Sequence, residues 1–103
     1  MKKKPSAFDE DVYNAVKKIP KGKVSTYGEI AVMAGHPGAA RAVGTSLHNN
    51  PYEGIVPCHR VVNASGHLAK DFVFGGIGVQ ADRLRAEGIK VTDGKVDLDK
   101  YGF

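Results

Sequence analysis

Apolar side chains recur every three or four positions from residue 7 onward, which is the spacing of one face of an α-helix. Acidic residues occupy the first turn of this segment, where they complement the helix dipole, and Pro20 ends the pattern. Residues 1–6 carry no such pattern, and we expect them to form a disordered basic tail. The sequence thus predicts a core-forming helix over residues 7–19. Its inward face would hold Phe8, Val12, Ala15, Val16 and Ile19.

Two more helices, joined by a short turn, are predicted over residues 26–34 and 38–48. Thr26 and Glu29 have the spacing of a capping box at the start of the first, and Gly35 follows its end. A helix, a short glycine-containing turn and a second helix make the helix-turn-helix pattern, which many helical pairs without nucleic-acid function share. The apolar side of the first helix would consist of Ile30, Val32 and Met33.

The helix predicted over residues 38–48 has two distinct faces. One face is small and polar around Arg41, so the helix could approach a nucleic-acid backbone closely while that arginine projects into a groove. On the helix pattern alone, Arg41 is more simply explained as an ordinary solvated arginine. Ala40, Val43 and Leu47 would face the core, whereas Arg41, Thr45 and His48 would lie on the polar face.

The second half of the chain is less regular. Val61 and Val62 are β-branched and predict a short strand, which a turn over residues 63–66 ends. An irregular loop over residues 67–76 then leads to a helix over residues 79–87. Ala81 and Leu84 should face inward, and Gly22, Gly35, Gly66 and Gly88 should fall at breaks between elements.

Residues 89–98 alternate around Asp93-Gly94, which predicts a β-hairpin. Taken with the helices, this small β element resembles a wing. The predicted fold class is therefore mainly α with small β, in a winged helix-turn-helix-like domain over residues 7–103.

Composition restricts the function classes without selecting one. A chain of 103 residues is one domain, and it has no apolar run long enough to cross a membrane and no apolar signal segment after its basic start, so we expect a cytoplasmic monomer, nucleoid-associated in a bacterium. The net charge of +4 lies entirely in residues 1–24, where seven lysines face three acidic residues, so charge by itself does not establish DNA binding. A single cysteine excludes an internal disulfide, and no zinc spacing is present, so we expect no metal.

The single cysteine has reactive neighbours. Cys58 is followed by His59 and Arg60, and Pro57 precedes it. A thiol is nucleophilic as the thiolate, and an imidazole and a guanidinium are groups that lower a cysteine pKa. The alternative is that Cys58 is a small buried hydrophobic residue, which composition alone favours.

Three segments resemble the O6-alkylguanine-DNA alkyltransferases, which move an alkyl group from guanine onto their own cysteine. Residues 57–62, Pro-Cys-His-Arg-Val-Val, are similar to the active-site signature of that family, and residues 22–31 and 39–44 resemble its helix-turn-helix. The resemblance extends from about residue 7 to the C-terminus. It implies that the chain binds double-stranded DNA containing O6-alkylguanine and that Cys58 accepts the alkyl group in a single turnover without a cofactor.

The resemblance also implies roles for particular residues. Glu87 would orient His59, which would draw the proton from Cys58 through a water and lower the pKa of the thiol, while Asn50 would span the turn before the active site. Arg41 would enter the base stack from the minor groove in place of the flipped guanine. The DNA contacts would be Thr26, Tyr27, Ala40, Arg41, Gly44, Thr45 and Arg60. The lesion pocket would be lined by Tyr27, Pro57, Cys58, Val61, Phe74, Gly75 and Gly76.

Two further functions remain open on the sequence. In the alkyltransferases a tyrosine precedes the glycine pair and a lysine follows it, whereas this chain has Val73 and Gln80 at the nearest positions. These differences, the short chain and the C-terminal segment resemble alkyltransferase-like sensors, which bind the lesion without removing it and present it to nucleotide excision repair proteins. Those sensors usually carry a tryptophan where Cys58 stands, which favours the enzyme. The third function is a helix-turn-helix regulator in which Cys58 is inert or redox-sensitive.

Overall fold

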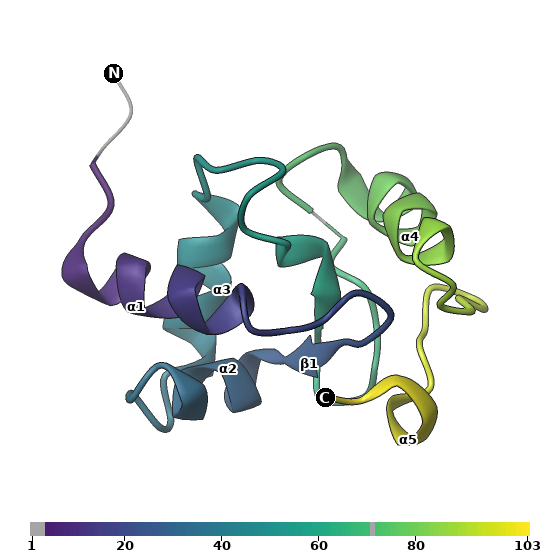
Figure 1. Ribbon diagram of the computed structural model, residues 1–103, viewed down its shortest axis with the longest axis horizontal. Coiled ribbons are helices and arrows are strands. Elements are labelled where there is room, and N and C mark those ends of the chain that lie inside the picture. Colours follow the sequence, from purple (N-terminus) through teal and green to yellow (C-terminus); the bar gives the residue numbers. More distant parts are fainter. Residues whose placement is uncertain (1–3, 71) are drawn as a thin grey trace.

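The computed structural model describes residues 4–70 and 72–103, and helices dominate that part of the chain (Figure 1). Three helices make up the N-terminal half, α1 (Ala7–Val16), α2 (Tyr27–Met33) and α3 (Ala40–His48). They pack together around a shared apolar core, which confirms the predicted helix-turn-helix. Of the predicted basic tail, residues 1–3 lie outside the described residues.

Helix α1 begins where predicted but ends earlier. Ser6 caps it, because its hydroxyl accepts from the N–H of Asp9 at 3.1 Å while the Asp9 carboxylate accepts from the N–H of Ser6 at 2.9 Å. The helix ends at Val16 rather than at residue 19. Ile19 is still buried, because the turn after the helix folds its side chain back into the core.

Helices α2 and α3 both begin later than predicted. Thr26 is the N-cap of α2, and its hydroxyl accepts from the N–H of Glu29. Gly38 has a φ of +87°, outside the helical region, so α3 begins at Ala40. The predicted inward position of Val32 is wrong: its side chain is 63% exposed, and Ala31 is buried in its place.

A two-stranded parallel sheet connects the two halves. β1 (Ser25–Thr26) pairs with β2 (Val61–Val62), which confirms the strand predicted there. Side chains along a strand alternate between its faces, so Val61 packs into the core of α1, α2 and α3 while Val62 packs into a second core. That second core consists of Val24, Val62, Leu68, Ala81, Leu84, Ile89, Val91 and Val96.

Helix α4 (Gly76–Ala86) covers the second core and begins before the predicted start at residue 79. Gly75 precedes it with a φ of +131°, and a Cβ at this position would lie 2.6 Å from Cγ2 of Val79. The glycine pair therefore starts the helix instead of extending the loop. Ala81 and Leu84 face inward as predicted.

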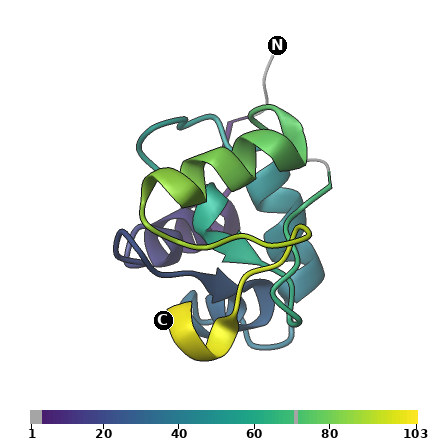
Figure 2. The same ribbon diagram turned by 90° about the vertical axis from the view of Figure 1, so that its right-hand side faces the viewer.

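The predicted hairpin over residues 89–98 is wrong. Asp93 and Gly94 do form a tight turn closed by a bridge between Thr92 and Lys95, but no pair of strands extends from it in the described residues. The segment after Gly94 pairs instead with the turn over residues 63–66, because the N–H of Val96 donates to the carbonyl of Gly66. Asp97 then caps a short helix, α5 (Leu98–Tyr101), beside which the C-terminus pairs with Val24 (Figures 1 and 2).

No helix among the described residues is both long enough and apolar enough to cross a membrane.

Candidate functional site

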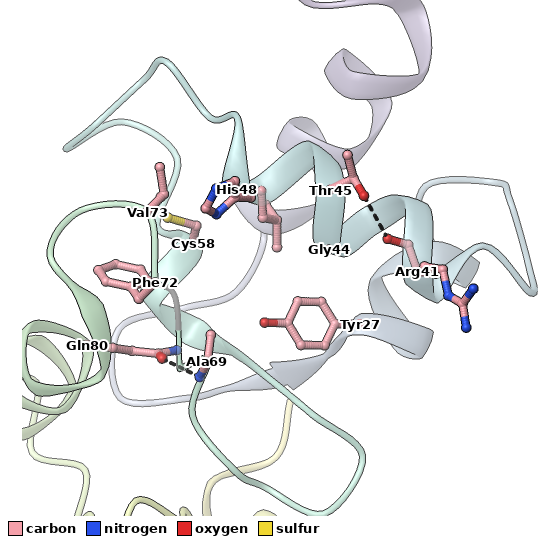
Figure 3. A pocket seen from close by; sticks show the side chains of 11 residues that line it. Tyr27, Arg41, Gly44, Thr45, His48, Cys58, Ala69, Phe72, Val73 and Gln80 are labelled. Carbon is pink, nitrogen blue, oxygen red and sulfur yellow. Dashed lines mark hydrogen bonds between the residues drawn. The ribbon is translucent and has the colours of Figure 1, made fainter.

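A pocket of about 380 Å³ opens between α3, the start of α2 and the loop that follows β2. Figure 3 shows Cys58 at one end of it with His48, Phe72 and Val73, and Tyr27 in its middle. Arg41 lies at the other end, and its guanidinium is directed away from the pocket. The lining residues are Tyr27, Arg41, Gly44, Thr45, Leu47, His48, Cys58, Ala69, Phe72, Val73 and Gln80.

Cys58 begins a single 3-10 turn, Cys58–Arg60, that separates Pro57 from β2. Its side chain is only 5% exposed. Burial raises the pKa of the Cys58 thiol above its usual value, and the hydrogen bond from Asn50 and the charge of Arg83 do not offset that effect. The predicted lowering of this pKa is therefore wrong, because the apolar surroundings penalise the thiolate more than the nearby cation stabilises it.

Asn50 braces the loop that precedes the cysteine. Its side-chain oxygen accepts from the N–H of Tyr52 at 2.8 Å, and its amide nitrogen donates to the carbonyl of Val56 at 3.4 Å. Both bonds are local and close the loop on itself. The side chain thus spans the turn as the resemblance implied.

Glu87 holds the two residues that follow Cys58. Its Oε2 accepts from Nε2 of His59 at 3.0 Å, and its two oxygens accept from Nη2 and Nε of Arg60 at 2.7 and 2.9 Å. Burial alone would raise the pKa of Glu87, but the hydrogen bonds from Arg60 and His59 hold it below its usual value. The carboxylate is therefore ionised at neutral pH, and His59 presents its Nε2 proton to it.

His59 is a neutral imidazole at neutral pH. Burial is the largest influence on its pKa and lowers it, and with the charges of Arg60 and Arg83 it outweighs the hydrogen bond and charge of Glu87. With Nε2 donating to Glu87, Nδ1 is the nitrogen that can accept a proton. In the described part of the chain, no hydrogen bond joins the Cys58 sulfur directly to this ring. His59 and Glu87 instead line a second cavity, of about 310 Å³, that also contacts Pro57.

Arg60 is placed differently from its predicted role as a DNA contact. Besides Glu87, its guanidinium donates to the carbonyl of Ile19 at 2.8 Å, and its side chain is largely buried. These bonds occupy the guanidinium inside the protein. In this arrangement Arg60 holds Glu87 against the turn that follows α1, and its contact with DNA stays a prediction.

The predicted lesion pocket overlaps only partly with the pocket observed. Tyr27 and Cys58 line it, but Pro57 faces the second cavity and Val61 is buried in the core. Phe74 packs edge to face on Phe72 outside the lining, and the glycine pair starts α4. From the sequence, Phe72 is open as either a pocket-lining or a core residue. The sequence does not identify Leu47, His48, Ala69, Val73 and Gln80 individually as lining residues.

For one missed residue a signal was present: His48 lies on the same polar helix face as Arg41 and Thr45. All three are exposed in the structure along one side of α3. Gly44 lies among them, and a Cβ there would lie 4.0 Å from the Tyr27 ring, so the small residue leaves room beside the pocket. Ala40 starts the helix, and the Thr26 hydroxyl is engaged in capping α2.

Gln80 is fully buried behind the pocket and uses its whole amide group. Its oxygen accepts from the N–H of Ala69 at 2.8 Å, and its nitrogen donates to the carbonyls of His59 and Val61 at 3.1 and 3.0 Å. The pocket loop, the active-site turn and β2 are thus joined by one side chain. The described residues contain no group of acidic, histidine and cysteine side chains that could hold a metal ion.

Comparison with known proteins places this site in a family. Residues 7–89 match the family model described as 6-O-methylguanine DNA methyltransferase, DNA binding domain. A DNA base-flipping protein from Vibrio parahaemolyticus is 46% identical over 95 residues, which cover 91% of this chain and 93% of that protein. A methylated-DNA–protein-cysteine methyltransferase from Methanosarcina acetivorans is 46% identical over 81 residues, which cover 79% of this chain and 51% of that protein.

A solved structure agrees with these sequence relatives. The crystal structure of S. pombe Atl1 in complex with damaged DNA containing O6-carboxymethylguanine superposes with a TM-score of 0.84 at 42% identity, covering 93% of this chain and 94% of that one. The chain belongs to the 6-O-methylguanine DNA methyltransferase family, through the DNA-binding domain of that family.

Proposed function

We propose that this protein recognises O6-alkylguanine in double-stranded DNA, turns the damaged nucleotide out of the helix through the minor groove, and transfers the alkyl group to Cys58 in one slow turnover. The observation that carries the proposal is the pocket itself, in which Cys58 shares one cavity with Tyr27 and with the exposed face of α3. An enzyme that acts on a base inside a duplex must first extrude it, and such a pocket receives the extruded base. Relatives that flip DNA bases or bind O6-alkylated DNA support the same function.

The groups behind the pocket support a transfer step. The Cys58 sulfur would form a bond to the alkyl carbon as the bond from that carbon to the guanine O6 breaks, and the guanine oxygen would take the electron pair. Nδ1 of His59 would receive the thiol proton through a water, because Nε2 donates to Glu87. The ionised Glu87 would stabilise the imidazolium that results. The cysteine is acceptor and catalyst together, so the reaction requires no cofactor.

Two features make this transfer slow. The raised pKa of Cys58 leaves little thiolate at neutral pH. In addition, Gln80 already donates both of its amide protons to backbone carbonyls, so it has no proton to offer the departing guanine oxygen. Both features also favour the alternative function, a lesion sensor that holds the flipped base and leaves its removal to nucleotide excision repair proteins.

Binding and flipping can be tested before transfer. We expect a duplex with one O6-methylguanine beside 2-aminopurine to bind at least about tenfold more tightly than the same duplex with guanine, with a rise in 2-aminopurine fluorescence as the stack opens. A Tyr27→Ala variant should lose most of this preference. Equal affinity for the two duplexes, without a change in fluorescence, would overturn the proposed function.

A further inference from the structure

We propose that Arg83 is a positioning residue of the pocket, which fixes both the aromatic wall beside Cys58 and the loop that leads into Cys58. The inference rests on the function proposed for the pocket and deepens it. Arg83 lies on α4 and belongs to none of the motifs described above. Its side chain joins two segments that are distant from each other in the sequence.

The first segment is the loop between α3 and the active-site turn. Nη2 of Arg83 lies 2.5 Å from Oε2 of Glu53 in this loop. Both side chains are partly exposed, so the ion pair adds little to overall stability, and we expect it to act on the position of the loop. The same loop ends at Pro57 and Cys58, so its position determines where the thiol enters the pocket.

The second segment is the pocket wall. Cζ of Arg83 lies 5.6 Å from the centre of the Phe72 ring and 5.4 Å from that of Phe74, both within the range of cation–π contacts. The two rings meet edge to face with their centres 5.9 Å apart. Phe72 lines the pocket with Cys58 and is nearly buried, so Arg83 supports the wall from behind.

The two partners of the ion pair also act on the pKa of the Cys58 thiol. Burial is the largest influence on the pKa of Cys58 and raises it; the charge of Arg83 lowers this pKa, whereas that of Glu53 raises it. Arg83 and Glu53 therefore shift the pKa of Cys58 in opposite directions, although they form one ion pair with each other. The other titratable groups near the thiol are Tyr13, whose pKa responds to the charge of Cys58, the adjacent His59, and Tyr27 and His48, which line the same pocket.

Because Arg83 and Glu53 shift the pKa of Cys58 in opposite directions, variants of the two residues distinguish an electrostatic role from a merely structural one. Arg83→Leu and Glu53→Gln both break the ion pair, so both should loosen the wall and change the ratio of affinities for O6-methylguanine and O6-benzylguanine duplexes by about threefold or more. The pH midpoint of Cys58 alkylation by iodoacetamide should rise in Arg83→Leu and fall in Glu53→Gln. Arg83→Lys should keep a midpoint near that of the parent while changing the affinity ratio, because lysine retains the charge but not the planar group.

Arg85→Leu is the matched control, since Arg85 lies on the same helix and donates to the carbonyl of Val91 away from the pocket. It should leave both readouts unchanged. Midpoints that move in the same direction in Arg83→Leu and Glu53→Gln, or an affinity ratio equal to that of the parent in both, would overturn the inference. Glu53→Gln keeps the test decisive if Arg83→Leu does not fold.

The thiol measurement needs no DNA, so it tests Arg83 even if the proposed function fails. If the parent protein binds the O6-methylguanine and O6-benzylguanine duplexes no more tightly than the guanine duplex, the proposed function is refuted, and with it the pocket-wall part of the inference. A parent protein that prefers lesions while the Arg83 and Glu53 variants behave like it refutes the inference alone.

Discussion

Single residues behind the pocket decide more of its chemistry than the residues that surround the cysteine in sequence. Arg60 adjoins the reactive motif, yet its guanidinium serves Glu87 and the carbonyl of Ile19. Gln80 lies far from the motif in sequence, yet it bonds the backbone of His59 and Val61 on either side of Arg60. The pKa of Cys58 likewise follows from burial, which only the folded chain reveals.

Gln80→Leu should destabilise the protein by about 3 kcal/mol. The change removes three hydrogen bonds, to the N–H of Ala69 and the carbonyls of His59 and Val61, at roughly 1 kcal/mol each. Urea unfolding followed by circular dichroism gives the free energy of unfolding. An exposed control, Asn49→Ala, should cost far less, and equal losses for the two variants would contradict this account of Gln80.

The stability of the protein should fall as pH decreases from about 7 to about 4. His59 has a folded pKa below its unfolded value of 6.5, so below that pH the unfolded chain binds more protons than the folded one. Glu87 also has a lowered folded pKa, so the stability that it contributes above its unfolded value of 4.5 is lost as pH falls further toward its folded pKa. Unfolding curves at a series of pH values test the slope, and His59→Gln should remove the part that begins near pH 6.5.

At the scale of elements, local patterns predicted α1, α2 and α3 well because each has its own apolar face, and α1 and α2 also have a capping side chain, Ser6 and Thr26. The errors occur where a distant segment decides the structure. The segment after Gly94 pairs with the turn at Gly66, where a Cβ would lie 2.2 Å from the carbonyl oxygen of Val96, and no periodicity within residues 89–98 reveals that approach. The start of α4 was missed because a glycine pair normally argues against a helix.

The glycine pair provides a test of that start. Gly75→Ala should destabilise the protein by about 1–3 kcal/mol, because φ is +131° and the new Cβ would lie 2.6 Å from Cγ2 of Val79. Gly78→Ala, in the same helix, meets nothing within 4 Å and should be neutral or stabilise by up to about 1 kcal/mol. Thermal unfolding of both variants compares them, and a Gly75→Ala variant as stable as Gly78→Ala would show that the helix starts elsewhere.

At the scale of the whole molecule, the family and the general position of the site could be predicted from the sequence, whereas the pocket lining could not. The motif at residues 57–62 identifies the cysteine, but only packing brings Leu47, Ala69 and Phe72 to it from separate segments. Charge is also distributed unexpectedly. The turn after α1, rich in lysine, lies on the opposite side of the molecule from the loop that lines the pocket (Figures 1 and 2).

Because of that distribution, removing Arg41 and removing a lysine of the turn after α1 should have different effects on the affinity for lesion DNA. Arg41→Ala should weaken binding to O6-methylguanine DNA by on the order of tenfold while leaving the fold intact, because an intercalated guanidinium would fill the gap left by the flipped base. Lys21→Ala removes the same charge from the turn after α1 and should change lesion affinity much less. Binding titrations at one salt concentration compare them. Similar losses for both would refute a specific role for Arg41.

The most direct test of the account is the mass of the intact protein after incubation with a duplex that carries O6-methylguanine. We expect the mass to increase by one methyl group per molecule, slowly near neutral pH and faster as pH rises toward the raised pKa of Cys58, and we expect no increase in Cys58→Ser. If the protein binds this duplex tightly and Cys58 remains unmodified after long incubation at every pH, transfer to Cys58 is contradicted and the protein is a lesion sensor.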